Sequence, residues 1–138
     1  MIKLVYEVLD EVSKKKSKAD KVQILKKHES WALKDIIRGS MDSTVKWNLP
    51  AGTPPYKPSD DYNHPSHLLK ENTQFKYFAK GGPGDALPAV KRERIFIGLI
   101  ESVHPRDAEL VIMMVNKEKP KGLTRPIVEE AFPGLLRD

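Results

Sequence analysis

The chain has 138 residues, of which 24 are Lys or Arg and 19 are Asp or Glu, so its formal net charge is +5. This length corresponds to a single domain, residues 1–138, with one hydrophobic core. The sequence contains no cysteine, which excludes disulfides, thiolate metal sites and cysteine nucleophiles and indicates a reducing compartment. It has neither a signal-peptide pattern nor an apolar run near the roughly 20 residues that cross a bilayer, so we expect a soluble, cytoplasmic protein with no membrane partner.

Apolar residues spaced three and four apart predict that most of the chain is helical. In the second predicted helix, Ser17 and Asp20 supply a hydroxyl and a carboxylate three residues apart, a pattern typical of a helix start. Ser30 can cap the third helix, whose predicted buried stripe includes Trp31. In chain order, we expect helices at 2–13, 18–28, 31–41, 67–79, 86–103, 106–117 and 125–131.

Prolines recur between 48 and 65, so neither a helix nor an inner strand can persist there. We predict a long loop, and its aromatic and imidazole side chains favour a loop that packs across the surface. Further on, Asp85 can cap one helix and Thr124 can begin the last, while the helix at 106–117 is apolar nearly all round and should be central. Because period-two alternation is never sustained, the predicted fold class is all-α, a single compact domain of six or seven helices.

Three motifs that could carry chemistry have a structural explanation that we favour. The run Lys18-Ala19-Asp20 is similar to the Lys-x-Asp-Gly nucleophile motif of nucleotidyl transferases, but Lys21 replaces the glycine and helix capping accounts for the carboxylate. His64 and His67 form the only close histidine pair in the sequence, and metal binding would need a third ligand from the neighbouring aspartates. The glycines at 81–84 lack the preceding strand and following Gly-Lys-Ser/Thr of a phosphate loop. We therefore expect no catalytic residue, no metal, no cofactor and no enzymatic activity.

Basic residues gather at two turns that each lead into a predicted helix, and Lys117 precedes the second of these turns. A smaller group, Lys91, Arg92 and Arg94, lies on the predicted polar side of the helix at 86–103. A solvated surface is the plain alternative for each group. Two basic turns that lead into helix N-termini nevertheless favour a protein that binds phosphates without reading bases. The candidate DNA-binding residues are Lys14, Lys15, Lys16, Lys18, Lys119, Lys121, Gly122, Thr124 and Arg125.

Two parts of the sequence resemble the N-terminal DNA-binding domain of tailed-phage ATP-dependent DNA ligases. Residues 4–31 are similar to its opening, with an amphipathic helix, a Lys-rich turn and a second helix. The later part is more specific: residues 108–114, then Gly122-Leu123-Thr124-Arg125-Pro126-Ile127-Val128, then Phe132-Pro133-Gly134-Leu135. This order resembles the end of the ligase domain, where a Gly-x-Ser/Thr turn leads through a short helix to an aromatic-Pro-Gly-Leu segment. The middle of the chain, with its Pro-rich loop, is not matched.

The resemblance implies an all-helical, ligase-like domain that clasps duplex DNA through its backbone and minor groove. Gly122, Thr124 and Arg125 carry over as contact residues by position, with Lys121 beside them. In the ligases the aromatic-Pro-Gly-Leu segment leads into the adenylation domain, whereas this sequence ends at Asp138 and contains no Lys-x-Asp-Gly. The resemblance therefore implies a phage protein of the host cytoplasm that binds double-stranded DNA without sequence preference and seals nothing.

An interaction module on the same fold is the alternative function. Its partner would be a replication, transcription or host protein. The apolar segment Phe132-Pro133-Gly134-Leu135-Leu136 could serve it as a hydrophobic hook, although packing of this segment on the core is the simpler interpretation.

Overall fold

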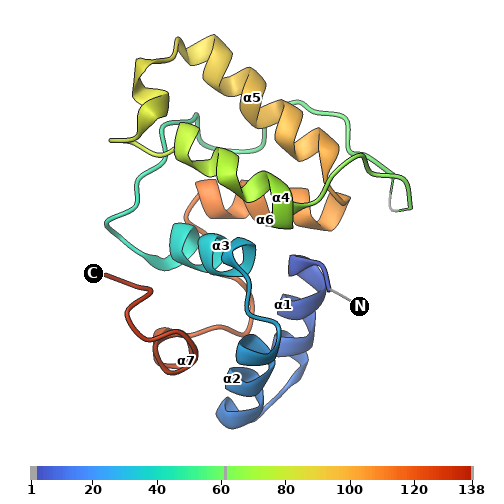
Figure 1. The fold of residues 1–138 in the computed structure, drawn as a ribbon, viewed down its shortest axis with the longest axis vertical. Helices are drawn as coiled ribbons and strands as arrows, with labels where there is room; N and C mark the ends of the chain where they lie inside the picture. The colour runs from blue at the N-terminus through green and yellow to red at the C-terminus, as the bar shows by residue number, and fades with distance from the viewer. Residues whose placement is uncertain (1–2, 61, 138) are drawn as a thin grey trace.

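The computed structural model describes residues 3–60 and 62–137, which form an all-helical, single compact domain (Figure 1). Its elements are α1 (Val5–Lys14), α2 (Lys18–Lys27), α3 (Trp31–Met41), α4 (Leu68–Glu71), the 3-10 helices η1 (Asn72–Tyr77) and η2 (Pro83–Ala86), α5 (Ala89–Ser102), α6 (Pro105–Val115) and α7 (Arg125–Ala131). Within the described residues, the only β pairing is an isolated antiparallel bridge between Trp47 and Ala79. No helix in the described part of the chain is long and apolar enough to cross a membrane. The predicted all-α class is confirmed.

Local sequence explains where α2 and α3 begin. The Ser17 hydroxyl accepts a hydrogen bond of 3.2 Å from the amide of Asp20, and the Ser30 hydroxyl accepts one of 3.1 Å from the amide of Leu33. These bonds satisfy amides that the first turn of a helix leaves unpaired. Both predicted caps are confirmed, whereas the first residue of the helix expected at 2–13 lies outside the described residues.

α6 is the central helix of the domain, as predicted. It packs against α1, α3 and α5 (Figure 1), and its Val111 and Met114 side chains are fully buried. α7 packs against α2 on the opposite side of α3 from α5. The C-terminal segment follows, with Phe132 and Leu136 buried in the same apolar cluster. The segment considered as a hydrophobic hook therefore packs on the core.

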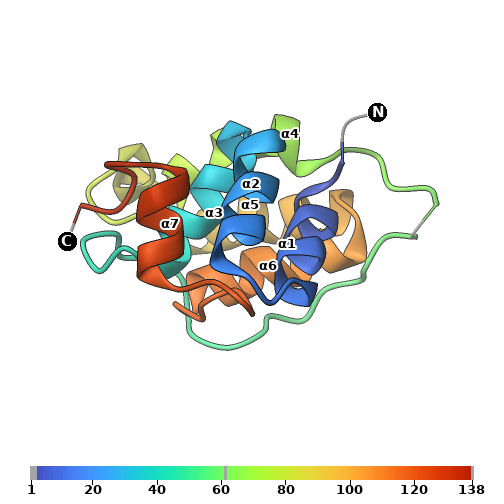
Figure 2. The same cartoon turned by 90° about the horizontal axis from the view of Figure 1, so that it is seen from below.

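The Pro-rich loop runs across the outside of α5 and α6 (Figure 2). Gly52 exchanges two hydrogen bonds with the Asn116 side chain, of 2.7 and 3.1 Å. The amide of Lys57 donates to the Glu101 carboxylate at 2.7 Å. Because backbone groups of the loop find partners on two helices, the loop is held to the surface, and this prediction is confirmed.

The single helix predicted at 67–79 is divided in the structure. One α-helical turn, α4, continues as the 3-10 helix η1. In a 3-10 helix, residues three apart lie on one side, and Asn72, Phe75 and Phe78 are all buried. The Asn72 amide also donates to the Asp35 carboxylate at 2.8 Å. The burial of every third residue and the hydrogen bond to Asp35 both fit a 3-10 helix, which is more tightly wound than an α-helix.

The helix predicted from 86 begins at Ala89. A proline disfavours the helical conformation of the residue before it, and Leu87, which precedes Pro88, is extended with ψ 144°. The prediction that Asp85 caps this helix is wrong, because its carboxylate accepts a 2.8 Å hydrogen bond from the amide of Gly81.

Trp31, which was predicted to be buried, is 73% exposed. Trp31 is the first residue of α3 and lies two residues before the fully buried Leu33. Two residues correspond to about 200° around an α-helix, so the two side chains point to nearly opposite sides. The prediction assumed that Trp31 lies on the buried side of its helix. It is wrong because the side chain points away from that side.

Candidate nucleic-acid interface

The two basic turns predicted from the sequence lie side by side (Figure 2). Gly122 sits against the end of α1, where a Cβ atom placed on it would lie 2.8 Å from the Cα of Ser13. The Lys21 ammonium of α2 donates a 2.8 Å hydrogen bond to the carbonyl oxygen of Gly122. The fold therefore joins two segments that are more than 100 residues apart in the sequence into one surface.

Six exposed lysines define this surface, which we call the basic surface: Lys14, Lys15, Lys16, Lys18, Lys119 and Lys121. Within the described residues, none of the six forms an ion pair with an acidic side chain. The exposed acidic residues of the same two segments are Asp20 and Glu118. Lysine charge exceeds carboxylate charge at the surface, so its potential is positive.

The N-terminus of α2 adds to this potential. α2 begins at Lys18, and Ser17 precedes it as the N-cap residue. The first amides of a helix carry a partial positive charge and attract anions. The helix start and the surrounding lysines therefore favour the same kind of ligand, an anion.

Gly122 has a special backbone conformation, and the close approach that it permits is internal. Its φ is 85°, a value that residues with a side chain rarely adopt. The atoms that approach it belong to Ser13. Gly122 thus positions the second turn against α1, and this contact inside the protein accounts for its close approach.

Thr124 and Arg125 lie at the start of α7. Thr124 is exposed and is the N-cap residue, as predicted, but its side chain makes no capping hydrogen bond. The Arg125 guanidinium donates to the Glu129 carboxylate at 3.0 Å. This i,i+4 pair offsets part of the Arg125 charge, so we expect Arg125 to attract phosphate less than Lys121 does.

Lys117 precedes the second basic turn but stabilises the end of α3. It has a positive φ of 58°. Its ammonium donates to the carbonyl oxygens of Gly39, Asp42 and Val45 at 2.8, 2.6 and 3.1 Å. A helix C-terminus leaves such carbonyls without partners, and a lysine can satisfy them. Lys117 therefore serves the fold.

Arg92 was predicted to lie on the polar side of α5, and this prediction is wrong. Its residue is 9% exposed. The guanidinium donates to three carbonyl oxygens, those of Asn48 at 2.7 Å, Leu87 at 3.1 Å and Gly84 at 3.2 Å. The planar, five-donor group of arginine suits such a cluster of acceptors. Arg92 ties the start of the Pro-rich loop to α5, while its neighbours Lys91 and Arg94 stay exposed.

The basic surface ends at a groove of about 190 Å³ between α1 and α6, lined in part by Lys121, Tyr6, Asp10 and Arg106. Arg106 pairs with Asp10 at 2.9 Å and lies 5.0 Å from the centroid of the Tyr6 ring. Burial, together with the nearby Glu7 carboxylate, raises the pKa of the Tyr6 phenol. Beyond Lys121, the Arg106 charge is therefore offset by that of Asp10.

Lys21 is the residue of this region that the sequence analysis missed. It was considered only because it replaces a glycine in Lys-x-Asp-Gly. Its partner, Gly122, is 101 residues away, so no local pattern indicates the contact. The described residues contain no group of His, Asp and Glu that could hold a metal ion.

Comparison with known proteins yields one family. Residues 8–121 match a family model described as a family of unknown function (DUF6433). The match includes the first basic turn and reaches Lys121 in the second. No curated protein matches the chain.

Proposed function

The chain belongs to the DUF6433 family, a family of unknown function, and on that premise we propose that it is a non-catalytic protein that binds duplex DNA without sequence preference. The observation that carries the proposal is the junction of the two lysine-rich turns at Gly122 and Ser13. Six ammonium groups on one surface would neutralise phosphates and release counterions. Among anionic ligands, a polyanion with regularly spaced phosphates would therefore bind such a surface most tightly.

The kind of side chain supports binding without base recognition. Lysine is a flexible point charge, whereas bidentate recognition of base edges relies on the fork of arginine or on amide side chains. Phosphate contacts position a protein on DNA and carry no sequence information by themselves. The resemblance to the ligase DNA-binding domain supports duplex DNA and the minor groove as the target.

The salt dependence of binding tests the proposal. Fluorescence anisotropy of a labelled duplex should give a slope of log affinity against log salt of about −0.9 per phosphate neutralised, so near −4 to −5 for about five contacts. We expect Lys16→Gln with Lys121→Gln to flatten the slope by about two units and to weaken several duplex sequences alike. Arg125→Gln should weaken binding less than Lys121→Gln, because Glu129 already pairs with Arg125.

The matched control is Lys76→Gln with Lys80→Gln, which removes the same charge elsewhere on the surface and should leave the slope unchanged. If the wild type shows no salt-sensitive duplex binding, or if both double variants change the slope equally, the basic surface is not a DNA site. Incubation with labelled ATP tests the non-catalytic part, and an adenylyl-lysine adduct would contradict it.

A further inference from the structure

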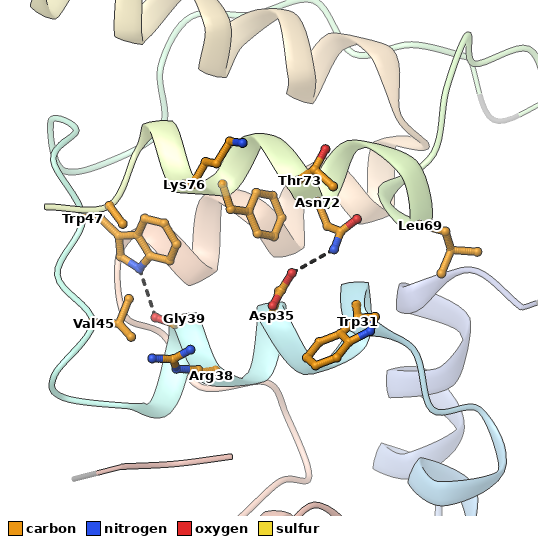
Figure 3. A pocket seen from close by; sticks show the side chains of 12 residues that line it. Trp31, Asp35, Arg38, Gly39, Val45, Trp47, Leu69, Asn72, Thr73 and Lys76 are labelled. Carbon is orange, nitrogen blue, oxygen red and sulfur yellow. Dashed lines mark hydrogen bonds between the residues drawn. The ribbon is translucent and has the colours of Figure 1, made fainter. Parts of the chain in front are cut away.

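A furrow between α3 and the α4–η1 segment lies on the side of the molecule opposite the basic surface (Figures 2 and 3). It comprises two adjoining cavities, of about 600 and 520 Å³, and Leu69 lines both. The larger cavity is lined by Trp31 and Trp47, which are the only two tryptophans of the chain. The smaller one lies against the starts of α1 and α3 and the end of α2.

Trp47 forms one end of the furrow, where a glycine gives it space (Figure 3). Its indole N–H donates to the carbonyl oxygen of Gly39 at 3.0 Å. A Cβ atom on Gly39 would lie 2.6 Å from the indole ring. Phe75 packs edge-on against the same ring, with 6.4 Å between the centroids. These contacts keep the end of the furrow apolar and hold it in place.

Trp31 stands at the other end of the larger cavity and is 73% exposed. The Lys34 ammonium lies 4.9 Å from the ring centroid and also pairs with Glu29. An exposed tryptophan beside a cavity is unusual for a free surface, and tryptophan is enriched among the residues that contribute most to protein interfaces. Trp31 therefore points to a partner that covers it.

The carboxylates that line the furrow are already engaged. Asp35 accepts a 2.8 Å hydrogen bond from Asn72 (Figure 3), and burial raises the pKa of its carboxyl. Glu29, in the smaller cavity, is paired with Lys34. Neither carboxylate is left to attract a cationic ligand.

The rim of the furrow is basic. Lys76 lines the larger cavity and Lys27 the smaller one. Both lysines are exposed, and neither is ion-paired within the described residues. The furrow is thus an apolar trough with positive charge at both ends.

We propose that this furrow is the docking site for an acidic amphipathic helix of a partner protein. An apolar trough between two helical segments receives such a helix through anchors at i, i+3, i+4 and i+7. Acidic side chains on the flanks of the helix would face Lys27 and Lys76, which favours this partner over neutral or basic ones. The surface is independent of the proposed DNA-binding function, because it lies on the other side of the molecule.

A single-stranded nucleic acid fits the furrow less well. Binding of bases depends on open aromatic faces, whereas Trp47 is half-buried and packed against Phe75. Val45 and Leu69 contribute aliphatic walls that suit leucine or phenylalanine anchors. The lining therefore favours a peptide.

The probe is a synthetic peptide of about 18 residues with Leu and Phe at the four anchor positions and Glu on the flanks. Two matched peptides carry Lys in place of Glu, or the same residues in an order without helical periodicity. Both tryptophans line the furrow, so their two indole N–H signals in ¹H–¹⁵N spectra report on it. We expect the acidic peptide to shift both signals with a dissociation constant of about 10–100 μM, and both matched peptides to bind at least about tenfold more weakly.

Two protein variants and their controls locate the site. Trp31→Ala leaves the core intact because the side chain is exposed, and it should weaken the peptide about tenfold. Lys27→Glu with Lys76→Glu should reverse the preference toward the Lys-containing peptide. Val90→Ala, an exposed apolar residue on α5, and Lys16→Glu, on the basic surface, should leave peptide binding unchanged.

The proposal is wrong if the acidic peptide shifts neither indole signal up to about 1 mM, or if the acidic and basic peptides bind equally. It is also wrong if oligo(dT) shifts the indole signals while the peptide does not, which would make the furrow a nucleic-acid site. Neither result bears on duplex binding by the basic surface, because Lys16 and Lys121 lie outside the furrow.

Discussion

Gly122 combines a backbone conformation that disfavours side chains with a contact that leaves no space for one. Gly122→Ala would bring a Cβ atom to 2.8 Å from the Cα of Ser13 at a φ of 85°. We expect a loss of about 1 kcal/mol from the backbone conformation and a further 1–3 kcal/mol from the clash. The free energy of unfolding, measured in urea, checks this expectation.

Gly134→Ala is the matched control for Gly122→Ala. Gly134 has nearly the same φ, 81°, but a Cβ atom on it would meet nothing within 4 Å. The difference between the two variants isolates the contact with Ser13. Equal losses would mean that the two basic turns are not held together at this point.

Arg92 is a second residue whose role is testable by a matched pair. Arg92→Met would leave the carbonyl oxygens of Asn48 and Leu87 without a donor, while that of Gly84 would keep the amide of Leu87. Buried acceptors without partners are costly, so we expect a loss of about 2–4 kcal/mol in the free energy of unfolding. Its exposed neighbour Lys91, changed to Met, should alter stability by less than about 0.5 kcal/mol. Similar losses in both variants would contradict the structural role of Arg92.

At the scale of elements, the start of α6 carries a buried carboxylate beside the Pro-rich loop. Asp107 is fully buried, and one carboxylate oxygen accepts a 2.9 Å hydrogen bond from the amide of Tyr6. The other oxygen has no partner among the described residues. The pKa of Asp107 is raised from 3.8 to about 6: burial is the main cause and Glu7 adds to it, while the Tyr6 amide, His64 and Arg106 partly oppose the rise.

This carboxylate predicts a pH-dependent contribution to stability. Because its pKa is higher in the folded state, the folded protein binds the proton more tightly than the unfolded chain does. Its contribution is fully present below about pH 4 and is lost as the pH rises to about 6, with an upper bound of about 3 kcal/mol. Asp107→Asn keeps an acceptor for Tyr6 but cannot ionise. We expect it to be more stable, relative to wild type, at pH 7.5 than at pH 4.5.

Urea midpoints of wild type and Asp107→Asn at the two pH values check the prediction. His64 packs edge-on against His104, with 5.5 Å between the ring centroids, and it is one of the groups that lower the pKa of Asp107. The double variant with His64→Gln therefore serves as the control. A stability difference that does not change with pH in either background would show that Asp107 does not ionise in this range.

At the scale of the whole molecule, the two proposed surfaces lie on opposite sides (Figure 2). One side carries the joined basic turns, and the other carries the furrow with both tryptophans. Such an arrangement suits an adaptor that holds a protein partner beside DNA, which unites the two functions considered from the sequence. It also makes a prediction that neither surface makes alone.

We expect the duplex and the acidic peptide to bind at the same time. Saturating peptide should leave the affinity of the labelled duplex within about twofold of its value without peptide, because the two sites share no residue. Lys16→Gln with Lys121→Gln should weaken the duplex only, and Trp31→Ala the peptide only. Mutual displacement would show that the sites overlap or are coupled.

The sequence by itself determined the elements of this protein. Hydroxyl caps at Ser17 and Ser30 and the apolar stripe of α6 act within a few residues, so their structural result can be predicted locally. The same holds for the Pro-rich loop, because proline restricts its own backbone and that of its neighbour. Failures at this level, such as the division of the predicted helix at 67–79, occurred where a tertiary contact of Asn72 intervenes.

Only the tertiary structure decided which basic residues share a surface. Lys21 and Gly122 meet across 101 residues, the guanidinium of the buried Arg92 reaches the carbonyl oxygen of Asn48, and the Lys117 ammonium reaches that of Gly39 in α3. The furrow beside Trp31 likewise forms between α3 and the α4–η1 segment, which the Pro-rich loop separates in the sequence. Caps and periodicity express interactions within one element, whereas a surface depends on how separate elements pack, and that packing is decided by the core they share.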